Sequence, residues 1–181
     1  IYLSGITLAI LPDDDCSALL NNLRSHKRKS ATIVFDPNIR PHLWQDNDRM
    51  RSVISQAASL SDIVLPSFDD ERAAFGDRDP KQTAQRYRAL GADHVVVKNG
   101  PADTILLQAG TLTSLSVPAI DGVIDTTAAG DSFNGAYIAR LLGGLSPTDA
   151  IHAAQTCAGR VIQHKGALVA FSDLATPTPV P

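Results

Sequence analysis

Short apolar runs rich in β-branched residues alternate along the chain with segments whose apolar residues recur at helical spacing. Strands that alternate with helices are joined by crossover connections, which bring the strands side by side in a parallel sheet. Such a sheet is covered by helices on both faces, so its strands are buried and almost continuously apolar. The alternation therefore predicts an α/β fold with a mainly parallel sheet between helices.

The same patterns predict the individual elements. Strands are expected around 1–5 and at 31–35, 63–65 and 94–97, and a hairpin is expected to pair 104–108 with 112–117. Helices are expected from 13 to beyond Leu23, and at about 48–60, 69–75, 81–90, 130–142 and 148–163. At roughly 150 residues per domain, the 181 residues form about one domain, over 1–175. The Pro-rich stretch 176–181 cannot continue a helix and is expected to be a tail.

Charge and cysteine content exclude several classes of protein. Lys and Arg number 16 against 19 Asp and Glu, so the net charge is −3, and without a basic block we expect no nucleic-acid partner. Cys16 and Cys157 lie far apart in no metal-like spacing, which fits the reducing cytoplasm. The apolar opening run lacks the flanking features of a signal peptide and is too short to span a bilayer, so we expect no membrane partner.

The stretch Asp125-Thr126-Thr127-Ala128-Ala129-Gly130-Asp131-Ser132-Phe133 has small residues where a loop enters a helix. A helix start leaves backbone N–H groups without intrahelical partners, and these groups together with the helix dipole favour an anion. A carboxylate beside an anion site, here Asp131, suits a base that takes the proton of a hydroxyl attacking phosphorus. On spacing alone, Asp131 is equally well explained as an acid that stabilises a helix start.

This stretch resembles the C-terminal signature of the ribokinase-like (PfkB) carbohydrate kinases, D-T-x-G-A-G-D followed by Ser or Thr and Phe. The resemblance implies a ribokinase-like three-layer α/β/α fold. It also implies that Asp131 is the catalytic base, in contact with the substrate, and that Ala128, Ala129 and Gly130 form the anion hole. Ala128 stands where the family usually has Gly.

A second segment, Phe35-Asp36-Pro37-Asn38-Ile39-Arg40-Pro41 with Leu43-Trp44, resembles the F-D-x-N-x-R-P-x-L-W element of 2-keto-3-deoxygluconate kinases. By this resemblance, Asn38 and Arg40 contact the nucleotide phosphates or the sugar, and the Arg40 guanidinium suits a substrate carboxylate. The expected reaction is the ATP-dependent phosphorylation of 2-keto-3-deoxy-D-gluconate to its 6-phosphate. A fructokinase or ribokinase of the same family is the alternative.

A third segment, Leu65-Pro66-Ser67-Phe68-Asp69-Asp70-Glu71 followed by Gly76, resembles the N-x-x-E region of the family. The spacing to Gly76 aligns Ser67 with the usual Asn and Asp70 with the usual Glu. The resemblance therefore implies that Asp70 organises Mg²⁺ through water. Glu71 takes this role if the register differs by one residue, and acids at the start of a helix are the structural explanation.

The segment 95–103 resembles the strand and the G-x-x-G nucleotide loop of the family. Gly100 matches the first glycine, Asp103 replaces the second, and Lys98 is expected to contact nucleotide phosphates. Near the C-terminus, Gly166 resembles part of the loop that closes over the nucleotide. The implied small-molecule partners are therefore ATP and a sugar acid.

Two further expectations come from the family. In some relatives, the counterparts of Asp125 and of the loop at Gly166 hold a monovalent cation, so K⁺ joins ATP and Mg²⁺ among the implied ligands. The full-length protein is expected to form homo-oligomers. Because all matched segments are C-terminal ones and Ile1 begins inside an expected strand, we expect the C-terminal part of such a kinase, without the N-terminal strands and lid and inactive by itself.

Two alternatives lie outside this family. Gly130-Asp131-Ser132-Phe133 resembles the G-D-S element of GDS-type esterases, and the spacing from Asp149 to His152 matches their D-x-x-H element. These would make Ser132 a nucleophile with His152 as its base, but they leave 125–129 unexplained. The other alternative is a nucleotide-binding or regulatory domain that has lost catalysis, against which the presence of Asp131 argues.

Overall fold

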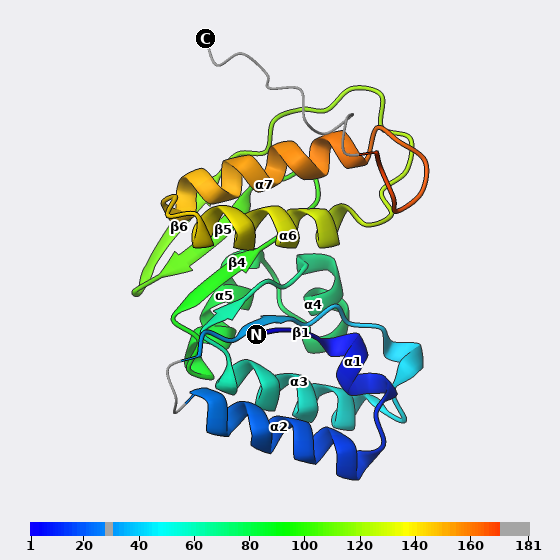
Figure 1. Ribbon diagram of the computed structural model, residues 1–181, viewed down its shortest axis with the longest axis vertical. Helices are drawn as coiled ribbons and strands as arrows, with labels where there is room; N and C mark the ends of the chain where they lie inside the picture. Colours follow the sequence, from blue (N-terminus) through cyan, green and yellow to red (C-terminus); the bar gives the residue numbers. More distant parts are fainter. Residues whose placement is uncertain (28–30, 171–181) are drawn as a thin grey trace. The chain divides into compact units, whose positions relative to one another are not determined.

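The computed structural model describes residues 1–27 and 31–170, so the expected Pro-rich tail at 176–181 lies outside the described residues. The chain divides into two compact units, residues 1–116 and 117–181. Figure 1 shows that the first unit holds the described strands, whereas the second is built around the last two helices.

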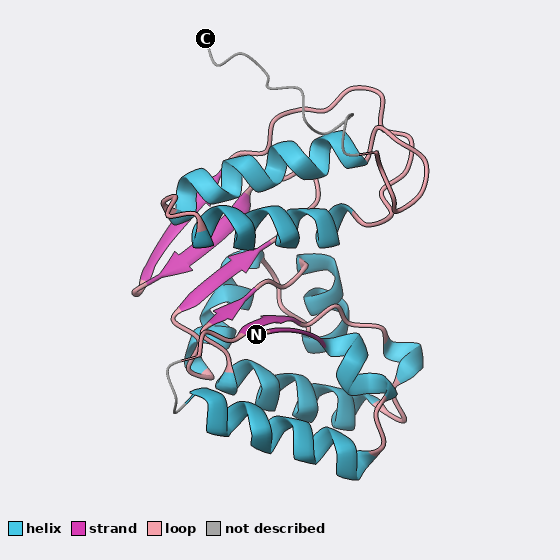
Figure 2. Ribbon diagram, viewed as in Figure 1, coloured by secondary structure: helices cyan, strands magenta, loops and turns pink. Residues whose placement is uncertain are grey.

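The sheet of the first unit has six strands, which lie in the order in which they follow along the chain. They are β1 (Tyr2–Ser4), β2 (Val34–Asp36), β3 (Ile63–Val64), β4 (His94–Val97), β5 (Thr104–Gln108) and β6 (Thr111–Leu115). β1 to β4 pair in parallel, and β5 pairs antiparallel with both β4 and β6 (Figure 2). The predicted α/β fold with a mainly parallel sheet is confirmed.

Five helices accompany this sheet in the first unit. They are α1 (Gly5–Ile10), α2 (Asp13–Lys27), α3 (Asn47–Leu60), α4 (Phe68–Phe75) and α5 (Pro80–Ala89), with a short 3₁₀ turn, η1, at Pro41–Leu43. α3 begins after Asp46, whose carboxylate accepts the N–H of Arg49 at 2.7 Å and so satisfies a donor that the helix start leaves unpaired. α4 ends at Gly76, whose left-handed backbone (φ 76°) suits a residue without a Cβ.

The core of the first unit consists of apolar residues from the parallel strands and from the helices beside them. Among the fully buried strand and pre-strand residues, this core includes Ile33, Phe35, Val64, Val95 and Val97. From the helices, Leu8, Met50 and Ile54 join the same core. Burial of successive residues along a strand is typical of a parallel sheet that helices cover, which explains why these strands are apolar without alternation.

Strand boundaries differ from the prediction where a neighbouring strand limits pairing. β2 is Val34–Asp36 rather than 31–35, because only these residues pair with β1. Of the opening strand expected around 1–5, only Tyr2–Ser4 forms β1, and helix α1 begins at Gly5. A Cβ at Gly5 would overlap the carbonyl oxygen of Pro37, so the turn after β2 approaches the start of α1 this closely only because residue 5 is glycine.

The second unit is built on α6 (Ala129–Leu142) and α7 (Pro147–Val161), which pack against each other. The buried rings of Phe133 and Tyr137, one turn apart on α6, stack with their centroids 6.2 Å apart. On α7, a Cβ at Gly159 would stand 2.8 Å from a side-chain carbon of Ile120, so this glycine permits a close contact. Within 1–27 and 31–170, no helix is long and apolar enough to cross a membrane.

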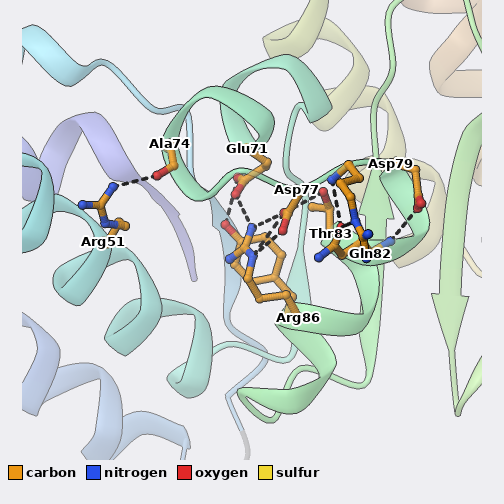
Figure 3. A network of polar contacts seen from close by, with 10 residues as sticks. Arg51, Glu71, Ala74, Asp77, Asp79, Gln82, Thr83 and Arg86 are labelled. Carbon is orange, nitrogen blue, oxygen red and sulfur yellow. Dashed lines mark hydrogen bonds and ion pairs between the residues drawn. The ribbon is translucent and has the colours of Figure 1, made fainter.

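A buried polar cluster joins α4 to α5 (Figure 3). The fully buried Glu71 carboxylate accepts the Tyr87 hydroxyl at 2.8 Å and Arg86 Nη2 at 2.6 Å. Arg86 Nη2 also donates to the buried Asp77 at 2.8 Å, and Asp77 accepts the Thr83 hydroxyl at 2.9 Å. Burial raises the pKa of Glu71 to about 7, although the Arg86 charge favours the ionised carboxylate and so opposes this rise. One cation thus holds two buried carboxylates.

Replacing Arg86 by Met should destabilise the first unit, because Glu71 and Asp77 lose their shared cation. The Arg86 side chain is 22% exposed, so we expect the free energy of unfolding to fall by about 3 kcal/mol, at the low end for a broken buried ion pair. Urea unfolding followed by circular dichroism measures this change.

Arg72→Met on α4 is the matched control. Arg72 pairs with Asp69 at 3.1 Å, but the two side chains are 62% and 79% exposed. An exposed pair of this kind contributes less than about 1 kcal/mol. Equal losses in the two variants would contradict the importance of the buried cluster.

Candidate functional site

Three parallel strands end at one edge of the sheet, and the polar groups of the first unit gather there. β2 ends at Asp36, the chain after β3 reaches Ser67, and β4 is followed by Lys98. A β-bridge pairs Ser67 with Lys98 in parallel. Because parallel strands run in the same direction, their carboxyl ends share an edge, and α/β sheets bind ligands at that edge. Segments far apart in the sequence thus supply one candidate site.

Asp36 is the buried carboxylate of this edge, with 3% of its surface exposed. Its Oδ1 lies 3.6 Å from the ammonium of Lys98 and accepts the N–H of Asn38 at 3.3 Å. Its Oδ2 accepts the hydroxyl of Tyr2 at 3.4 Å. Asp36 is not among the site residues predicted from the sequence. The available signal was an acid directly after a buried strand, within the Phe35-to-Pro41 segment.

The turn after β2 carries Asn38 and Arg40, two of the predicted ligand-binding residues. Asn38 has a positive φ of 36°, which asparagine tolerates better than most residues. Arg40 Nη1 donates to its neighbour Ile39 at 2.8 Å and lies 3.4 Å from Oδ2 of Asp70. The Arg40 and Asp70 side chains are 44% and 32% exposed, so this ion pair is open to a ligand. Burial raises the pKa of the Asp70 carboxyl, and the Arg40 charge opposes that rise.

The two candidate metal ligands, Asp70 and Glu71, have different surroundings although they are adjacent. Asp70 lies beside Arg40 at the strand edge, whereas Glu71 is fully buried in the cluster with α5. Mg²⁺ keeps several waters when it binds a protein, so it requires a carboxylate that water can reach. The geometry therefore favours Asp70. Ser67, which aligns with the usual Asn, precedes α4 and makes no side-chain cap hydrogen bond there.

The loop between β4 and β5 begins at Lys98, whose N–H donates to the carbonyl of Pro66 at 2.9 Å. Gly100 has a left-handed backbone with φ 55°, which suits the position matched to the first glycine of the family loop. The carboxylate of Asp103, which replaces the second glycine, accepts the hydroxyl of Ser114 at 2.6 Å. Asp103 therefore ties this loop to β6.

A pocket of about 490 Å³ lies beside the same loop. Its lining comes from the start of α5, the loop and β5, and consists of Asp79, Pro80, Lys81, Asn99, Ala102, Asp103 and Ile105. Of the residues predicted to bind nucleotide, Asp103 lines this pocket, whereas Lys98 and Gly100 are not among the lining residues.

In the second unit, the predicted anion-hole segment forms the start of α6. Ala128 precedes the helix with a left-handed backbone of φ 61° and ψ 11°. The N–H of Ala129 donates to the carbonyl of Thr126 at 3.2 Å, so this group is used within the loop. Gly130 and Asp131 lie in the first turn, and Asp131 is exposed. The structure thus places the predicted base at the helix start that the sequence indicates.

Asp125 and Gly166, which the sequence analysis linked to one cation-binding loop, lie together in the second unit. Asp125 Oδ1 accepts the N–H of Thr127 at 2.9 Å, and Oδ2 accepts the N–H of Gly166 at 2.9 Å. A side-chain hydrogen bond from Thr127, together with these two backbone hydrogen bonds, lowers the pKa of the Asp125 carboxyl. The carboxylate therefore ties the chain after α7 to the segment that leads into α6.

The side chains of the esterase alternative are not arranged for nucleophilic catalysis. The Ser132 hydroxyl donates to the carbonyl of Ala129 at 3.0 Å, within its own helix start. His152 Nδ1 lies 3.3 Å from Oε1 of Gln155 on α7. In the described part of the chain, neither residue takes part in the serine–histidine hydrogen bond that activates such a nucleophile.

Comparison with known proteins supports the resemblance. The family described as pfkB family carbohydrate kinase matches residues 1–173. The 2-dehydro-3-deoxygluconokinases of Dickeya dadantii (strain 3937) and Escherichia coli (strain K12) are each 38% identical to this chain over 173 residues. Each match covers 93% of this chain and 56% of the relative, so the chain spans about half the length of these curated relatives.

Solved structures of similar fold also include kinases and a PfkB protein. A PfkB protein from Polaromonas sp. JS666 matches with a TM-score of 0.81 and 27% identity, over 97% of this chain and 56% of that one. Aminoimidazole riboside kinase from Salmonella enterica, complexed with aminoimidazole riboside and an ATP analog, matches with a TM-score of 0.82 and 26% identity. That match covers 96% of this chain and 62% of the other.

The left-handed backbone of Ala128 gives a prediction for stability. A residue with a Cβ pays about 1–2 kcal/mol for this conformation, whereas glycine adopts it readily but loses more chain entropy on folding. We therefore expect Ala128→Gly to raise the free energy of unfolding by about 0.5–1 kcal/mol. Urea unfolding of the two proteins measures the difference.

Ala129→Gly is the control, since Ala129 is the first residue of α6 and has a helical backbone. There the same replacement removes helix propensity and should destabilise by up to about 1 kcal/mol. A loss of stability in both variants would argue against strain at Ala128.

Proposed function

This chain belongs to the pfkB family of carbohydrate kinases, and we propose that the protein transfers the γ-phosphoryl group of ATP to a sugar acid. The proposed acceptor is the terminal hydroxyl of 2-keto-3-deoxy-D-gluconate, and the product is its 6-phosphate. The observation that carries the proposal is an exposed carboxylate, Asp131, in the first turn of a helix that begins with small residues. The names of the two curated relatives described above support this choice of acceptor.

In the proposed reaction, Asp131 accepts the proton of the attacking sugar hydroxyl. A bond forms between the sugar oxygen and the γ-phosphorus, the bond from that phosphorus to the β,γ-bridging oxygen breaks, and ADP leaves with the electron pair. Of the proposed anion hole Ala128 to Gly130, the backbone N–H groups of Ala128 and Gly130 favour the negative charge on the phosphoryl oxygens, whereas the N–H of Ala129 is used within the loop. Positioning and charge stabilisation then account for most of the catalysis.

The first unit would supply the groups that hold the nucleotide. Lys98, Asn38 and Arg40 offer N–H donors at the carboxyl edge of the sheet, and Gly100 lets the loop after β4 approach a ligand closely. In the same unit, the loop residue Asp103 is proposed to border the nucleotide.

We propose that Asp70 holds Mg²⁺ through water. No group of three or more His, Cys, Asp or Glu side chains suited to a metal occurs among residues 1–27 and 31–170. That fits Mg²⁺, which is bound by one or two carboxylates plus waters and substrate phosphates. Bound there, Mg²⁺ would neutralise charge on the phosphates. In the second unit, the Asp125 carboxylate and the loop at Gly166 are the proposed place for K⁺.

The choice of sugar depends on Arg40 in this proposal. Its side chain is 44% exposed, and a guanidinium matches a carboxylate in two hydrogen bonds, which favours a sugar acid over a neutral sugar. A fructokinase or ribokinase remains the alternative, in which Arg40 contacts only phosphate. We further propose that the reaction takes place in the cytoplasm, as the two free cysteines suggest, and that the full-length protein forms homo-oligomers.

Asp131→Asn should abolish most of the turnover, because the amide keeps size and polarity but cannot accept the proton. We expect kcat to fall by a factor of about 10²–10⁴, as for a lost general base, while ATP affinity changes little. The measurement is the steady-state rate of sugar-acid phosphorylation by the full-length protein, with ATP binding measured by calorimetry.

Asp149→Asn is the matched control, because Asp149 is also an acid in the first turn of a helix, α7. Its replacement should leave kcat near that of the parent. If Asp131→Asn turned over like the parent, the assignment of the base would be wrong.

Arg40→Lys tests the substrate class. Lysine keeps the charge but loses the bidentate geometry, so we expect kcat/KM for the sugar acid to fall about tenfold. The value for a neutral sugar such as fructose should fall less. Equal losses on the two sugars would indicate a phosphate contact instead.

A further inference from the structure

Asp36 is the one carboxylate described above that contacts both segments predicted to bind phosphate in the first unit. It lies 3.6 Å from the Lys98 ammonium, at the start of the nucleotide loop. It also accepts the N–H of Asn38, in the turn that leads to Arg40. These segments follow β2 and β4, with β3 between them in the sheet. A single buried side chain therefore connects two loops that the sheet keeps one strand apart.

The surroundings of Lys98 restrict its side chain. Its backbone is fixed on both sides, because its N–H donates to Pro66 at 2.9 Å and its carbonyl accepts the N–H of Phe68 at 2.8 Å. The side chain itself is only 12% exposed, and the Asp36 side chain is 4% exposed. A lysine side chain has many rotamers, and their loss opposes ligand binding unless the side chain is already held in place. An ammonium has three N–H donors, so a carboxylate can orient it while it contacts a phosphate.

The burial of the Asp36 carboxylate at this edge requires a physical explanation. Burial of a charge is costly without a partner, and a hydrophobic residue at the end of a buried strand would avoid that cost. The Asp36 carboxylate has its cost offset by Lys98, Asn38 and Tyr2, and two of these belong to the proposed nucleotide site. Its contacts thus serve the geometry of the site as well as the stability of the strand.

We propose that Asp36 is a positioning residue, which fixes the Lys98 ammonium and the turn at Asn38 so that both are ready for the polyphosphate of a nucleotide. The inference rests on the proposed nucleotide role of Lys98. Asp36 itself does not touch the reacting atoms in this proposal. It acts through Lys98, so its replacement affects nucleotide binding and loses its effect once Lys98 is removed.

The test uses four versions of the full-length protein: the parent, Asp36→Asn, Lys98→Met and the double variant. ATP binding is measured by calorimetry, and KM for ATP and kcat are measured with the sugar acid. We expect Lys98→Met to weaken ATP binding by about tenfold, as for a lost hydrogen bond to a charged group. Asp36→Asn should weaken it by about 3- to 10-fold, since the lysine must now be ordered on binding. The effect on KM for ATP should exceed that on kcat.

The double variant decides whether Asp36 acts through Lys98. We expect it to bind ATP as Lys98→Met does, because residues that act as one unit do not add. Additive losses, or ATP binding by Asp36→Asn equal to that of the parent, would overturn the positioning role. Unchanged binding by Lys98→Met would remove the nucleotide role of Lys98 and the inference with it. Non-additive ATP binding without any sugar phosphorylation would support the inference while refuting the proposed reaction.

Asp62→Asn is the matched structural control. Asp62 lies just before β3, and its Oδ2 accepts the N–H of Ile33 at 2.8 Å at the opposite, amino edge of the same strands. It should lower the melting temperature without changing KM for ATP. If Asp36→Asn fails to fold, Asp36→Glu replaces it. That variant keeps the ion pair but moves the ammonium, so it should also raise KM for ATP, and an unchanged KM would overturn the inference.

Discussion

The parallel pairing of β1 to β4 determines where the polar groups of the first unit can lie. β2 and β3 are buried along their length and β4 nearly so, which means that a charged side chain is tolerated only at a strand end or beyond it. Because the strands run in one direction, those ends meet at one edge. Asp36, Asp70 and Lys98 are brought together for this reason, although more than sixty positions separate the first from the last.

Adjacent acids in α4 illustrate how helix geometry gives two neighbouring carboxylates different surroundings. The helix turns by about 100° between Asp70 and Glu71. Asp70 accordingly lies at the open edge beside Arg40, and Glu71 is enclosed with Arg86 and Tyr87. The enclosed carboxylate fixes α4 against α5, and the open one is thereby held at the edge. A buried ion cluster is weak evidence for stability in general, but it specifies one arrangement of the two helices.

In both units, a residue with a positive φ shapes a turn beside the proposed site. Asn38 and Ala128 have positive φ values of 36° and 61°, and each precedes a segment whose N–H groups or side chains are proposed to meet an anion. In each case, a nearby carboxylate accepts a backbone N–H: Asp36 that of Asn38, and Asp125 that of Thr127. The same device, an aspartate that accepts an N–H two residues ahead, shapes both turns.

The fold class and most of the elements could be predicted from the sequence, because hydrophobic periodicity and turn residues are local signals. β4 and β5 lie at the predicted positions, and α3, α4, α6 and α7 begin within one residue of those predicted. The resemblance of the surrounding segments to family motifs also identified Asn38, Arg40, Lys98 and Asp131 as candidate site residues. The boundaries of β2 and the end of the opening strand were predicted less well, because a strand extends only as far as its neighbour pairs with it.

The contacts that hold the polar residues depend on tertiary packing. Nothing in the spacing of the chain reveals that Lys98 lies against Asp36 or that Glu71 is enclosed by Arg86, and the resemblance that linked Asp125 with the loop at Gly166 did not predict the hydrogen bond between them. Each contact joins residues 15 to 62 positions apart, so it depends on how strands and helices pack rather than on local preference. Local sequence specifies which groups are present, and burial and long-range packing decide which of them are held and which remain open to a ligand.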